Sequence, residues 1–369
     1  MLCLTRHGDG ATFTKLMDRK RSQEMTLQQN KEVREFANDV AICLASENKC
    51  LNPKYLYDNV GSQLFEQICL QPEYYPSRTE ASLLERYAPI ITNLVGSNIR
   101  IIELGSGSSS KTSILLRYLS SQNKRIYYFP IDISSSILTE STKRLQSQFP
   151  NASIIGIRSD YNTGIDAAAV KCMAANAEEE EKKKKNNNNR SNNNYNSYQY
   201  PKLILFLGSS IGNFEPIAAA SFLRSIRQKL RTKDFLLVGF DLQKDESVLY
   251  SAYNDNAGIT AKFNLNLLAR INRELGGNFE LEKFKHYAFY NSEQHRIEMH
   301  LVSTIDQQVY VETFGKNFSF RKGDSIHTEN SYKYSLDQIA ALAMDSGFRI
   351  VKDFTDERGW FNMTLLSPS

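Results

Sequence analysis

The pattern of hydrophobic and polar residues divides the chain into a helical beginning, a central region of alternating strands and helices, and a final region richer in strands. Apolar residues recur at three- and four-residue steps from about Lys31, which predicts the first helix. Two more helices are expected at 61–70 and 80–91, separated by a loop at 72–76 that two prolines bracket. Residues 1–30 are polar and are expected to form a leader.

The central region alternates short apolar runs, typical of buried strands, with amphipathic stretches typical of helices. The expected strands are 99–104, 126–131, 153–157, 203–207 and 235–240, and the expected helices are 109–121, 134–149 and 216–230. Such alternation indicates parallel βαβ units. We therefore expect an α/β fold built on a doubly wound, Rossmann-like sheet.

After the fifth strand the pattern changes, which predicts a second unit of α+β type. Two helices at 245–257 and 259–275 precede strands at 284–290, 296–304 and 309–313, and a helix at 336–346 and strands at 349–354 and 360–366 close the chain. We expect this α+β unit, together with the N-terminal helices, to form the substrate-binding domain.

One segment inside the sheet region, 166–199, breaks the alternation. It contains consecutive runs of Glu, Lys and Asn, and almost nothing in it can be buried. We interpret it as a disordered surface insertion, with a partner-binding role of the Asn tract as the alternative.

The composition of the chain mainly argues against particular classes of partner and site. Charged residues are 23% of the chain and the net charge is +4, with no basic run beside an aromatic platform, which argues against a nucleic-acid partner. The five cysteines form no CxxC pair and no metal-ligand spacing with histidine, so we expect reduced thiols, a cytoplasmic location and no metal site. We also expect a monomer. No apolar run reaches the roughly 20 residues that cross a membrane.

A glycine-rich loop follows the first expected strand, in the string ELGSGSSSK at Glu103–Lys111. Ligands of doubly wound sheets bind beyond the carboxyl ends of the strands, where glycine lets the backbone approach them closely. A pyrophosphate fingerprint would need a third glycine at Ser110. The loop therefore fits a nucleoside such as S-adenosylmethionine (SAM) better than NAD.

Acidic and aromatic residues follow the next two expected strands. Asp132 can accept both ribose hydroxyls, although it could instead cap the next helix. Asp160 can accept the adenine amine while Tyr161 stacks on the base, although alone this pair could equally form a turn. Asn213, in the loop after the fourth strand, can hold a carboxylate or an amine. Together, features at the ends of successive strands predict a nucleoside site.

Several strings resemble the L-histidine Nα-methyltransferase family of the ergothioneine pathway, over roughly residues 53–369 apart from the insertion. They are Tyr57–Ser62, Pro72–Glu80, Glu103–Lys111, Leu207–Asn213, Ala252–Asp255, Phe263–Asn266, Arg296–Met299 and Glu329–Tyr334. The resemblance implies a class I methyltransferase that uses SAM to methylate the α-amino group of L-histidine, up to trimethylhistidine (hercynine). It also implies a SAM-binding domain (80–243 plus 334–369) and a substrate-binding domain (31–79 plus 244–333).

The resemblance further implies roles for individual residues. SAM is expected to contact Gly105, Lys111, Asp132, Asp160 and Tyr161, the last of which is usually Phe in the family. The substrate is expected to contact Tyr74, Asn213, Tyr253, Met299, Glu329 and Ser331, with Tyr57 and Tyr74 as the catalytic pair that orients the amine.

Each substrate contact has a physical rationale. Asn213 and Tyr253 can donate to the carboxylate, and Met299 offers a soft apolar wall. Glu329 can accept an imidazole N–H, and Ser331 can complete the pairing as donor or acceptor.

Structural and functional alternatives remain at this stage. Tyr253 could be a core residue, Glu329 a surface carboxylate and Met299 a packing residue. The substrate could be another amino acid such as tryptophan, whose enzymes are expected to lack the polar pair for imidazole. The chain could also be a non-catalytic SAM-binding protein, which is expected to lose its substrate residues.

Overall fold

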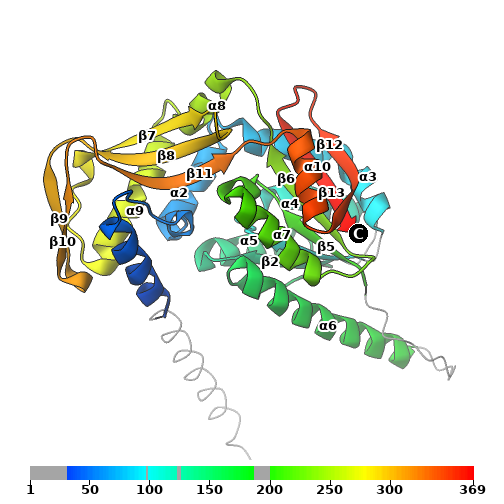
Figure 1. The fold of residues 1–369 in the computed structure, drawn as a ribbon. Coiled ribbons are helices and arrows are strands. Elements are labelled where there is room, and N and C mark those ends of the chain that lie inside the picture. Colours follow the sequence, from blue (N-terminus) through cyan, green and yellow to red (C-terminus); the bar gives the residue numbers. More distant parts are fainter. Residues whose placement is uncertain (1–30, 97–98, 123–125, 187–199) are drawn as a thin grey trace, which may run out of the picture.

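The computed structural model describes residues 31–96, 99–122, 126–186 and 200–369 (Figure 1). Its centre is one sheet of eight strands in the order β12-β13-β6-β5-β1-β2-β3, with β4 also paired to β2. These strands are β1 (Arg100–Leu104), β2 (Tyr127–Asp132), β3 (Ser153–Ile154), β4 (Ile157–Arg158), β5 (Lys202–Phe206), β6 (Phe235–Asp241), β12 (Phe348–Thr355) and β13 (Phe361–Pro368).

The neighbouring strands β2, β1, β5 and β6 pair in parallel, and β13 lies antiparallel between β6 and β12. Because β1 and β5 are buried along almost their whole length, they read in the sequence as continuous apolar runs. A mostly parallel sheet with one reversed strand near its edge is the arrangement expected of a class I methyltransferase. The predicted fold class is therefore confirmed.

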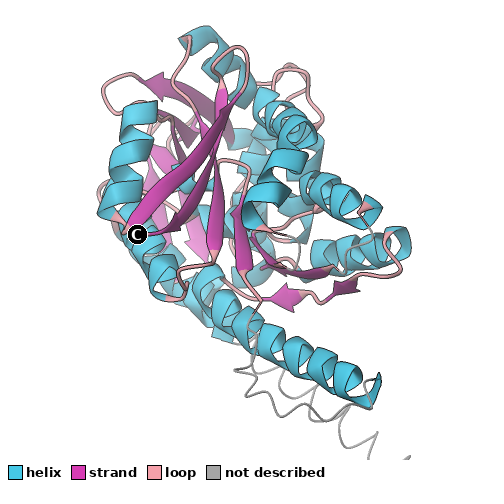
Figure 2. Ribbon diagram, turned by 90° about the vertical axis from the view of Figure 1, so that its right-hand side faces the viewer, coloured by secondary structure: helices cyan, strands magenta, loops and turns pink. Residues whose placement is uncertain are grey.

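Helices cover both faces of this sheet (Figure 2). They are α3 (Tyr75–Val95), α4 (Ser110–Ser121), α5 (Ser135–Gln148), α6 (Tyr161–Asn186), α7 (Pro216–Gln228) and α10 (Leu336–Asp345). One apolar cluster is buried between the sheet and α6, α7 and α10, and another between the sheet and α3 and α4. The carboxyl ends of β1, β2 and β5 remain available for a site.

Several predicted boundaries were wrong; the helix expected at 245–257, for example, ends at Tyr253. Helix α3 begins at Tyr75, five residues before the expected start, because Pro76 lies in its first turn, where a missing N–H costs no helical hydrogen bond. The expected strand at 153–157 is divided into β3 and β4, which both pair with β2.

The predicted disordered insertion also needs correction. Residues 166–186 continue α6, whereas 187–199 and the predicted leader at 1–30 lie outside the described residues. The helical part begins with an alanine-rich stretch, which favours helix. In the sequence each Glu of 178–181 precedes a Lys by four positions, a spacing that supports helix as well.

A second unit of α+β type packs beside the sheet. Its helices are 31–45, η1 (Pro53–Leu56), α2 (Asn59–Cys69), α8 (Glu246–Tyr253) and α9 (Ile259–Leu275). Its strands are β7 (Phe284–Asn291), β8 (Arg296–Ser303) and β11 (Ser325–Tyr332), which form one sheet, and the hairpin of β9 (Gln307–Val311) and β10 (Lys316–Phe320). The remaining short helices are η2 (Ser210–Asn213), η3 (Leu281–Lys283) and η4 (Glu312–Phe314).

This second unit has its own core. The buried residues of that core all come from 36–75 and 249–326. The α+β unit was predicted, but β10 and the full extent of β11 were not.

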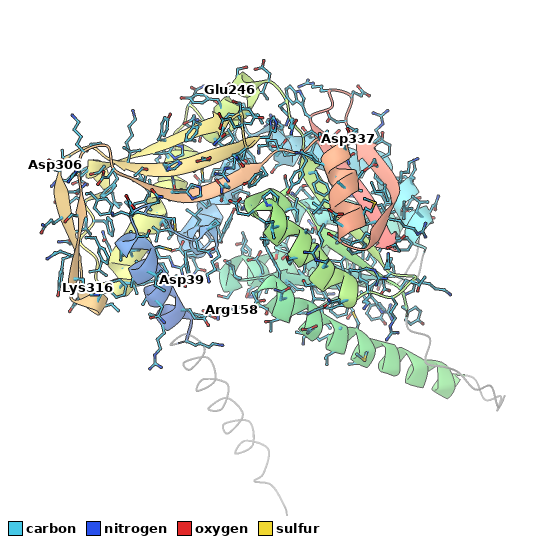
Figure 3. The ribbon with its side chains drawn as sticks, viewed as in Figure 1. Asp39, Arg158, Glu246, Asp306, Lys316 and Asp337 are labelled. Carbon is cyan, nitrogen blue, oxygen red and sulfur yellow. The ribbon has the colours of Figure 1, made fainter. Side chains whose placement is uncertain are left out.

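Charged side chains of both signs are spread over the outside of the molecule, for example Arg158, Glu246, Lys316 and Asp337 (Figure 3). This distribution agrees with the near balance of 45 basic and 41 acidic residues. Within the described ranges, no helix combines the length and the apolar character that a membrane span requires.

Candidate active site

The glycine-rich loop between β1 and α4 has a backbone conformation that favours glycine. Gly105 and Gly107 have φ angles of 65° and 49°. A Cβ atom at Gly105 would lie 3.1 Å from the Tyr161 hydroxyl, so this tyrosine is directly beside the loop. The buried hydroxyl of Ser106 has no hydrogen-bond partner among the described residues. The loop therefore fits a ligand that supplies a polar contact at this point.

Asp132 holds the other side of the loop from the end of β2. Its carboxylate accepts the N–H groups of Gly107 and Ser134, each at 2.8 Å. Burial raises the pKa of Asp132, and these backbone donors oppose that shift. Because each carboxylate oxygen has more than one acceptor site, Asp132 can order the loop and still accept ribose hydroxyls.

The two residues after β4 differ in their surroundings. Asp160 is exposed and accepts the N–H and hydroxyl of Thr163 at 2.9 and 3.0 Å, so it caps the start of α6. Tyr161 is half-buried, and its ring centre lies 5.4 Å from that of Phe206 and 5.7 Å from that of Phe222. Tyr161 thus adjoins the expected nucleoside position, while the contact of Asp160 with adenine stays a prediction.

Lys111 forms an ion pair with the fully buried Glu80. The Glu80 carboxylate also accepts the N–H of Gly208 at 2.9 and 2.8 Å. Burial acts to lower the pKa of Lys111, but the charge and hydrogen bond of Glu80, together with nearby Cys69 and Glu103, outweigh it and the pKa is raised. Lys111 therefore links α3, α4 and the loop after β5, and its contact with SAM stays a prediction.

The substrate side of the site is built on β8 and β11. Met299 on β8 lies opposite Glu329 on β11, and all of Met299, Glu329 and Ser331 are buried. Residues two apart on a strand share a face. These three predicted substrate residues are therefore together on one face of the sheet.

Glu329 has the environment expected of a ligand-binding carboxylate. Its Oε2 atom is buried and has no hydrogen-bond partner in the described part of the chain. Burial raises the pKa of Glu329 to about 7, although the charge of Lys333 lowers it. An unpartnered buried acceptor is costly, by about 1–3 kcal/mol. This cost indicates that a bound molecule supplies the missing donor.

Ser331 has the complementary hydrogen-bonding character. Its Oγ atom accepts the Tyr253 hydroxyl at 2.7 Å and the Lys333 ammonium group at 2.8 Å. These bonds occupy both lone pairs of Ser331, which leaves its own proton to be donated elsewhere. Lys333 also donates to Tyr253 at 3.1 Å and forms a buried ion pair with Asp241 at 2.9 Å.

An aromatic group surrounds these polar atoms. The ring centre of Tyr57 lies 5.5 Å from that of Phe65, and the ring centre of Tyr74 lies 6.2 Å from those of Phe65 and Tyr253. Burial raises the pKa of Tyr57 and of Tyr74 well above the usual range. Both phenols therefore stay protonated at neutral pH.

Tyr57 also connects the two halves of the site. After burial, the charges of Glu329 and then Tyr161 contribute most to the raised pKa of Tyr57. Such contributions require that Tyr57 lie close to both residues. The predicted catalytic tyrosine is therefore near the carboxylate of Glu329 and near Tyr161, the residue beside the glycine-rich loop.

Asn213 ends η2 and is half-buried. A Cβ atom at Gly212 would lie 2.8 Å from the carbonyl oxygen of Tyr332, so this loop packs directly on β11. Glu215, two residues further on, accepts the amide of Asn330 at 2.8 Å and the hydroxyl of Tyr332 at 2.5 Å. The loop that carries Asn213 is thus fastened to the strand that carries Ser331.

Four charged residues that hold the site together were not predicted from the sequence, namely Glu80, Glu215, Asp241 and Lys333. A signal for Lys333 was present, because it lies two residues after Ser331 within the string Glu329–Tyr334. For Asp241, whose partner is distant in the sequence, no comparable signal exists.

Comparison with known proteins supports the same interpretation. The sequence profile of a family described as histidine-specific, SAM-dependent methyltransferases matches residues 36–368. Histidine N-alpha-methyltransferases from Mycolicibacterium smegmatis and Mycobacterium tuberculosis are 35% and 34% identical to this chain, each covering 89% of it and 93% of the relative. Ergothioneine biosynthesis protein 1 from Neurospora crassa is 31% identical over 81% of this chain, a match that covers 31% of the fungal protein. The match over nearly the whole chain establishes that it belongs to the histidine-specific, SAM-dependent methyltransferase family.

Proposed function

We propose that this chain transfers methyl groups from SAM to the α-amino nitrogen of L-histidine, up to trimethylhistidine (hercynine), as a step towards ergothioneine. The observation that carries the proposal is the pairing of an acceptor, Glu329, with a donor, Ser331, on one face of β11. A neutral imidazole has one N–H and one bare ring nitrogen, and it complements this pair. An indole has an N–H but no acceptor nitrogen, so tryptophan would leave Ser331 without a partner.

The proposed SAM site combines the predicted residues with one additional hydroxyl. Asp132 would accept the ribose hydroxyls, Asp160 and Tyr161 would contact adenine, and Gly105 would allow close approach of the backbone. Ser106 is a further contact, because its buried hydroxyl lacks a partner among the described residues. Bound SAM supplies a methyl group activated by its positive sulfur.

The substrate amine would be held by the aromatic group. Because Tyr57 and Tyr74 keep their protons at neutral pH, they would orient the amine as hydrogen-bonding groups rather than act as bases. The proton lost in each round would pass to solvent base. Positioning of this kind can contribute several kcal/mol to catalysis.

The carboxylate of histidine would be held mainly by Asn213. Tyr253 donates to Ser331 in this structure, so it would reach the carboxylate only by turning its hydroxyl. Met299, which lies opposite Glu329, would contact the ring.

We infer that the two units divide the work, with residues 31–79 and 244–333 binding the substrate and residues 80–243 and 334–369 binding SAM. The separate core of the first unit supports this division. We propose a monomer that acts in the cytosol on a small molecule, and the free thiols of the four described cysteines support that location.

The proposal is tested by incubating the purified protein with SAM and single amino acids. The panel contains L-histidine, its two ring-N-methylated forms and L-tryptophan. Formation of S-adenosylhomocysteine gives the rate, and mass spectrometry counts the added methyl groups. We expect turnover of histidine and loss of turnover when the ring N–H is replaced by methyl. Faster turnover of tryptophan would refute the substrate, and SAM binding without turnover of any amine would refute the activity.

A further inference from the structure

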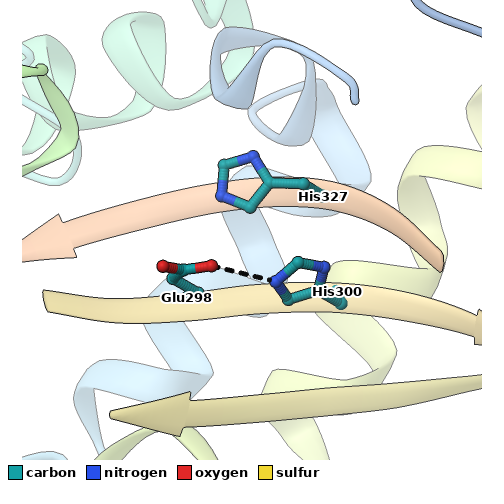
Figure 4. A group of neighbouring side chains, drawn as sticks. All are labelled: Glu298, His300 and His327. Carbon is teal, nitrogen blue, oxygen red and sulfur yellow. Dashed lines mark hydrogen bonds and ion pairs between the residues drawn. The ribbon is translucent and has the colours of Figure 1, made fainter. Parts of the chain in front are cut away.

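A group of potential metal ligands, Glu298, His300 and His327, lies on the β7–β8–β11 sheet (Figure 4). Glu298 and His300 flank Met299 on β8, and His327 on β11 pairs with His300. Because neighbouring residues of a strand point to opposite faces, Glu298 and His300 point away from the side occupied by Met299. The group is therefore separate from the proposed methyl-transfer site.

The three side chains are close enough to share one ion. One ligand atom from each lies within 4.8 Å of the other two. The Oε2 atom of Glu298 is 3.3 Å from the Nε2 atom of His300, and the rings of His300 and His327 are 5.1 Å apart at 59°. Ligand atoms on a tetrahedral zinc ion lie about 3.3 Å apart, given bonds of about 2.0–2.1 Å. Glu298 and His300 already have this separation, and a ring nitrogen of His327 lies within 4.8 Å of both.

Surrounding hydrogen bonds hold the ligands in place. The Oε1 atom of Glu298 accepts Asn291 and Arg296, each at 2.9 Å, so that Oε2 is left to face His300. The backbone of His327 is fixed by hydrogen bonds with Lys49 (2.9 Å) and Leu51 (2.8 Å). Contacts that orient ligands in this way are typical of metal sites.

The rings themselves are only lightly engaged. His300 stacks on Phe289 with ring centres 5.6 Å apart, and His327 has a hydrogen bond of 2.8 Å with Asn330. A bound ion would replace one hydrogen bond on each ring. Both rings are partly buried, and 15% of the His300 side chain is exposed, so an ion here would be bound mainly by the three side chains.

The chemistry of the ligands selects the class of ion. Two imidazoles and one carboxylate suit zinc and its neighbours, whereas magnesium and calcium prefer sites made of oxygen atoms. The guanidinium of Arg296 offsets part of the Glu298 charge, which further disfavours ions held mainly by charge. We propose that Glu298, His300 and His327 bind a divalent transition-metal ion of the zinc class on the back of the sheet that carries the substrate residues.

The first test is calorimetric titration of the chelator-treated full-length protein with Zn²⁺, in the absence of SAM and histidine. We expect one ion per chain, and loss of this binding in His300→Ala and in His327→Ala. The matched control is His295→Asn, which changes an exposed histidine outside the group and should bind as the wild type does. Circular dichroism checks that each variant is folded. Absence of saturable binding in the wild type would overturn the proposal.

A second test separates this site from the thiols of Cys43 and Cys50, whose sulfur atoms lie 3.4 Å apart. Co²⁺ bound by nitrogen and oxygen lacks the strong near-ultraviolet absorption that thiolate ligands produce. We expect no such band in the wild type and unchanged binding in Cys43→Ser. Binding that survives both histidine substitutions and disappears in Cys43→Ser would place the ion at the thiols and refute the assignment. These readouts do not depend on methyl transfer.

Discussion

Replacement of Glu329 tests the imidazole contact directly. The Oε2 atom is buried without a partner among the described residues, and a bound imidazole N–H would be its donor. Hydrogen bonds to charged groups contribute about 1.5–3 kcal/mol, whereas neutral ones contribute about 0.5–1.5 kcal/mol. Glu329→Gln keeps the shape and an acceptor but loses the charge, so kcat/KM for histidine should fall about tenfold. Glu329→Ala loses the whole contact, and the fall should be about 10- to 150-fold.

The assay is the initial rate of S-adenosylhomocysteine formation at pH 8 with SAM in excess. The KM for SAM should stay unchanged, because Glu329 lies on the substrate side of the site. Without substrate, Glu329→Gln is expected to raise Tm, because the substitution removes the charge of a buried carboxylate whose Oε2 atom lacks a partner among the described residues. The control is Glu293→Gln, which alters an exposed carboxylate and should change neither kcat/KM for histidine nor Tm. A Glu329→Ala variant that methylates histidine as fast as the wild type would refute the proposed contact.

Three further predictions concern the residues that support the site. Lys333→Met should lower the free energy of unfolding by about 1–3 kcal/mol in denaturant titrations, because Asp241 loses one of its two buried cations and keeps Lys244; an unchanged midpoint would contradict this. Gly105→Ala should weaken SAM binding in calorimetry, since φ is 65° and the new Cβ would lie 3.1 Å from the Tyr161 hydroxyl; equal affinity would mean that the loop adjusts. Burial raises the pKa of Glu103 from 4.5 to about 7. The folded state therefore favours protonated Glu103, and this contribution is lost as the pH rises through 7. Between pH 5 and pH 8 the wild type should lose up to about 3 kcal/mol relative to Glu103→Gln, and parallel stability curves for the two proteins would contradict the prediction.

The grouping of the expected SAM residues around the glycine-rich loop could be predicted from the sequence because these residues come soon after strand ends. In a parallel sheet, the ends of neighbouring strands meet, so Gly105, Asp132 and Tyr161 could be placed together before any coordinates were known. The substrate side is different. Tyr57 and Glu329 come from distant segments, and only the resemblance to a family connected them.

Buried charge was the main feature that the pattern could not reveal. A hydrophobicity pattern assigns charged residues to the surface, so it cannot predict that Asp241 and Lys333 lie buried against each other. It also led to the interpretation of 166–199 as disordered. The Glu and Lys runs were considered by their total charge, whereas their four-residue spacing favours a helix.

The buried pair of Asp241 and Lys333 has a consequence for how the molecule moves. Asp241 ends a strand of the large sheet, Lys333 follows the last strand of the small one, and backbone hydrogen bonds link Tyr334 to Asp241 and to Gln243 beside them. Swinging the two units apart here would leave the buried Lys333 ammonium group without its counter-ion, whereas Asp241 would keep Lys244, at a cost of a few kcal/mol. The two units are therefore expected to stay in contact at this junction while ligands bind. Heat or denaturant should unfold both units in a single cooperative transition.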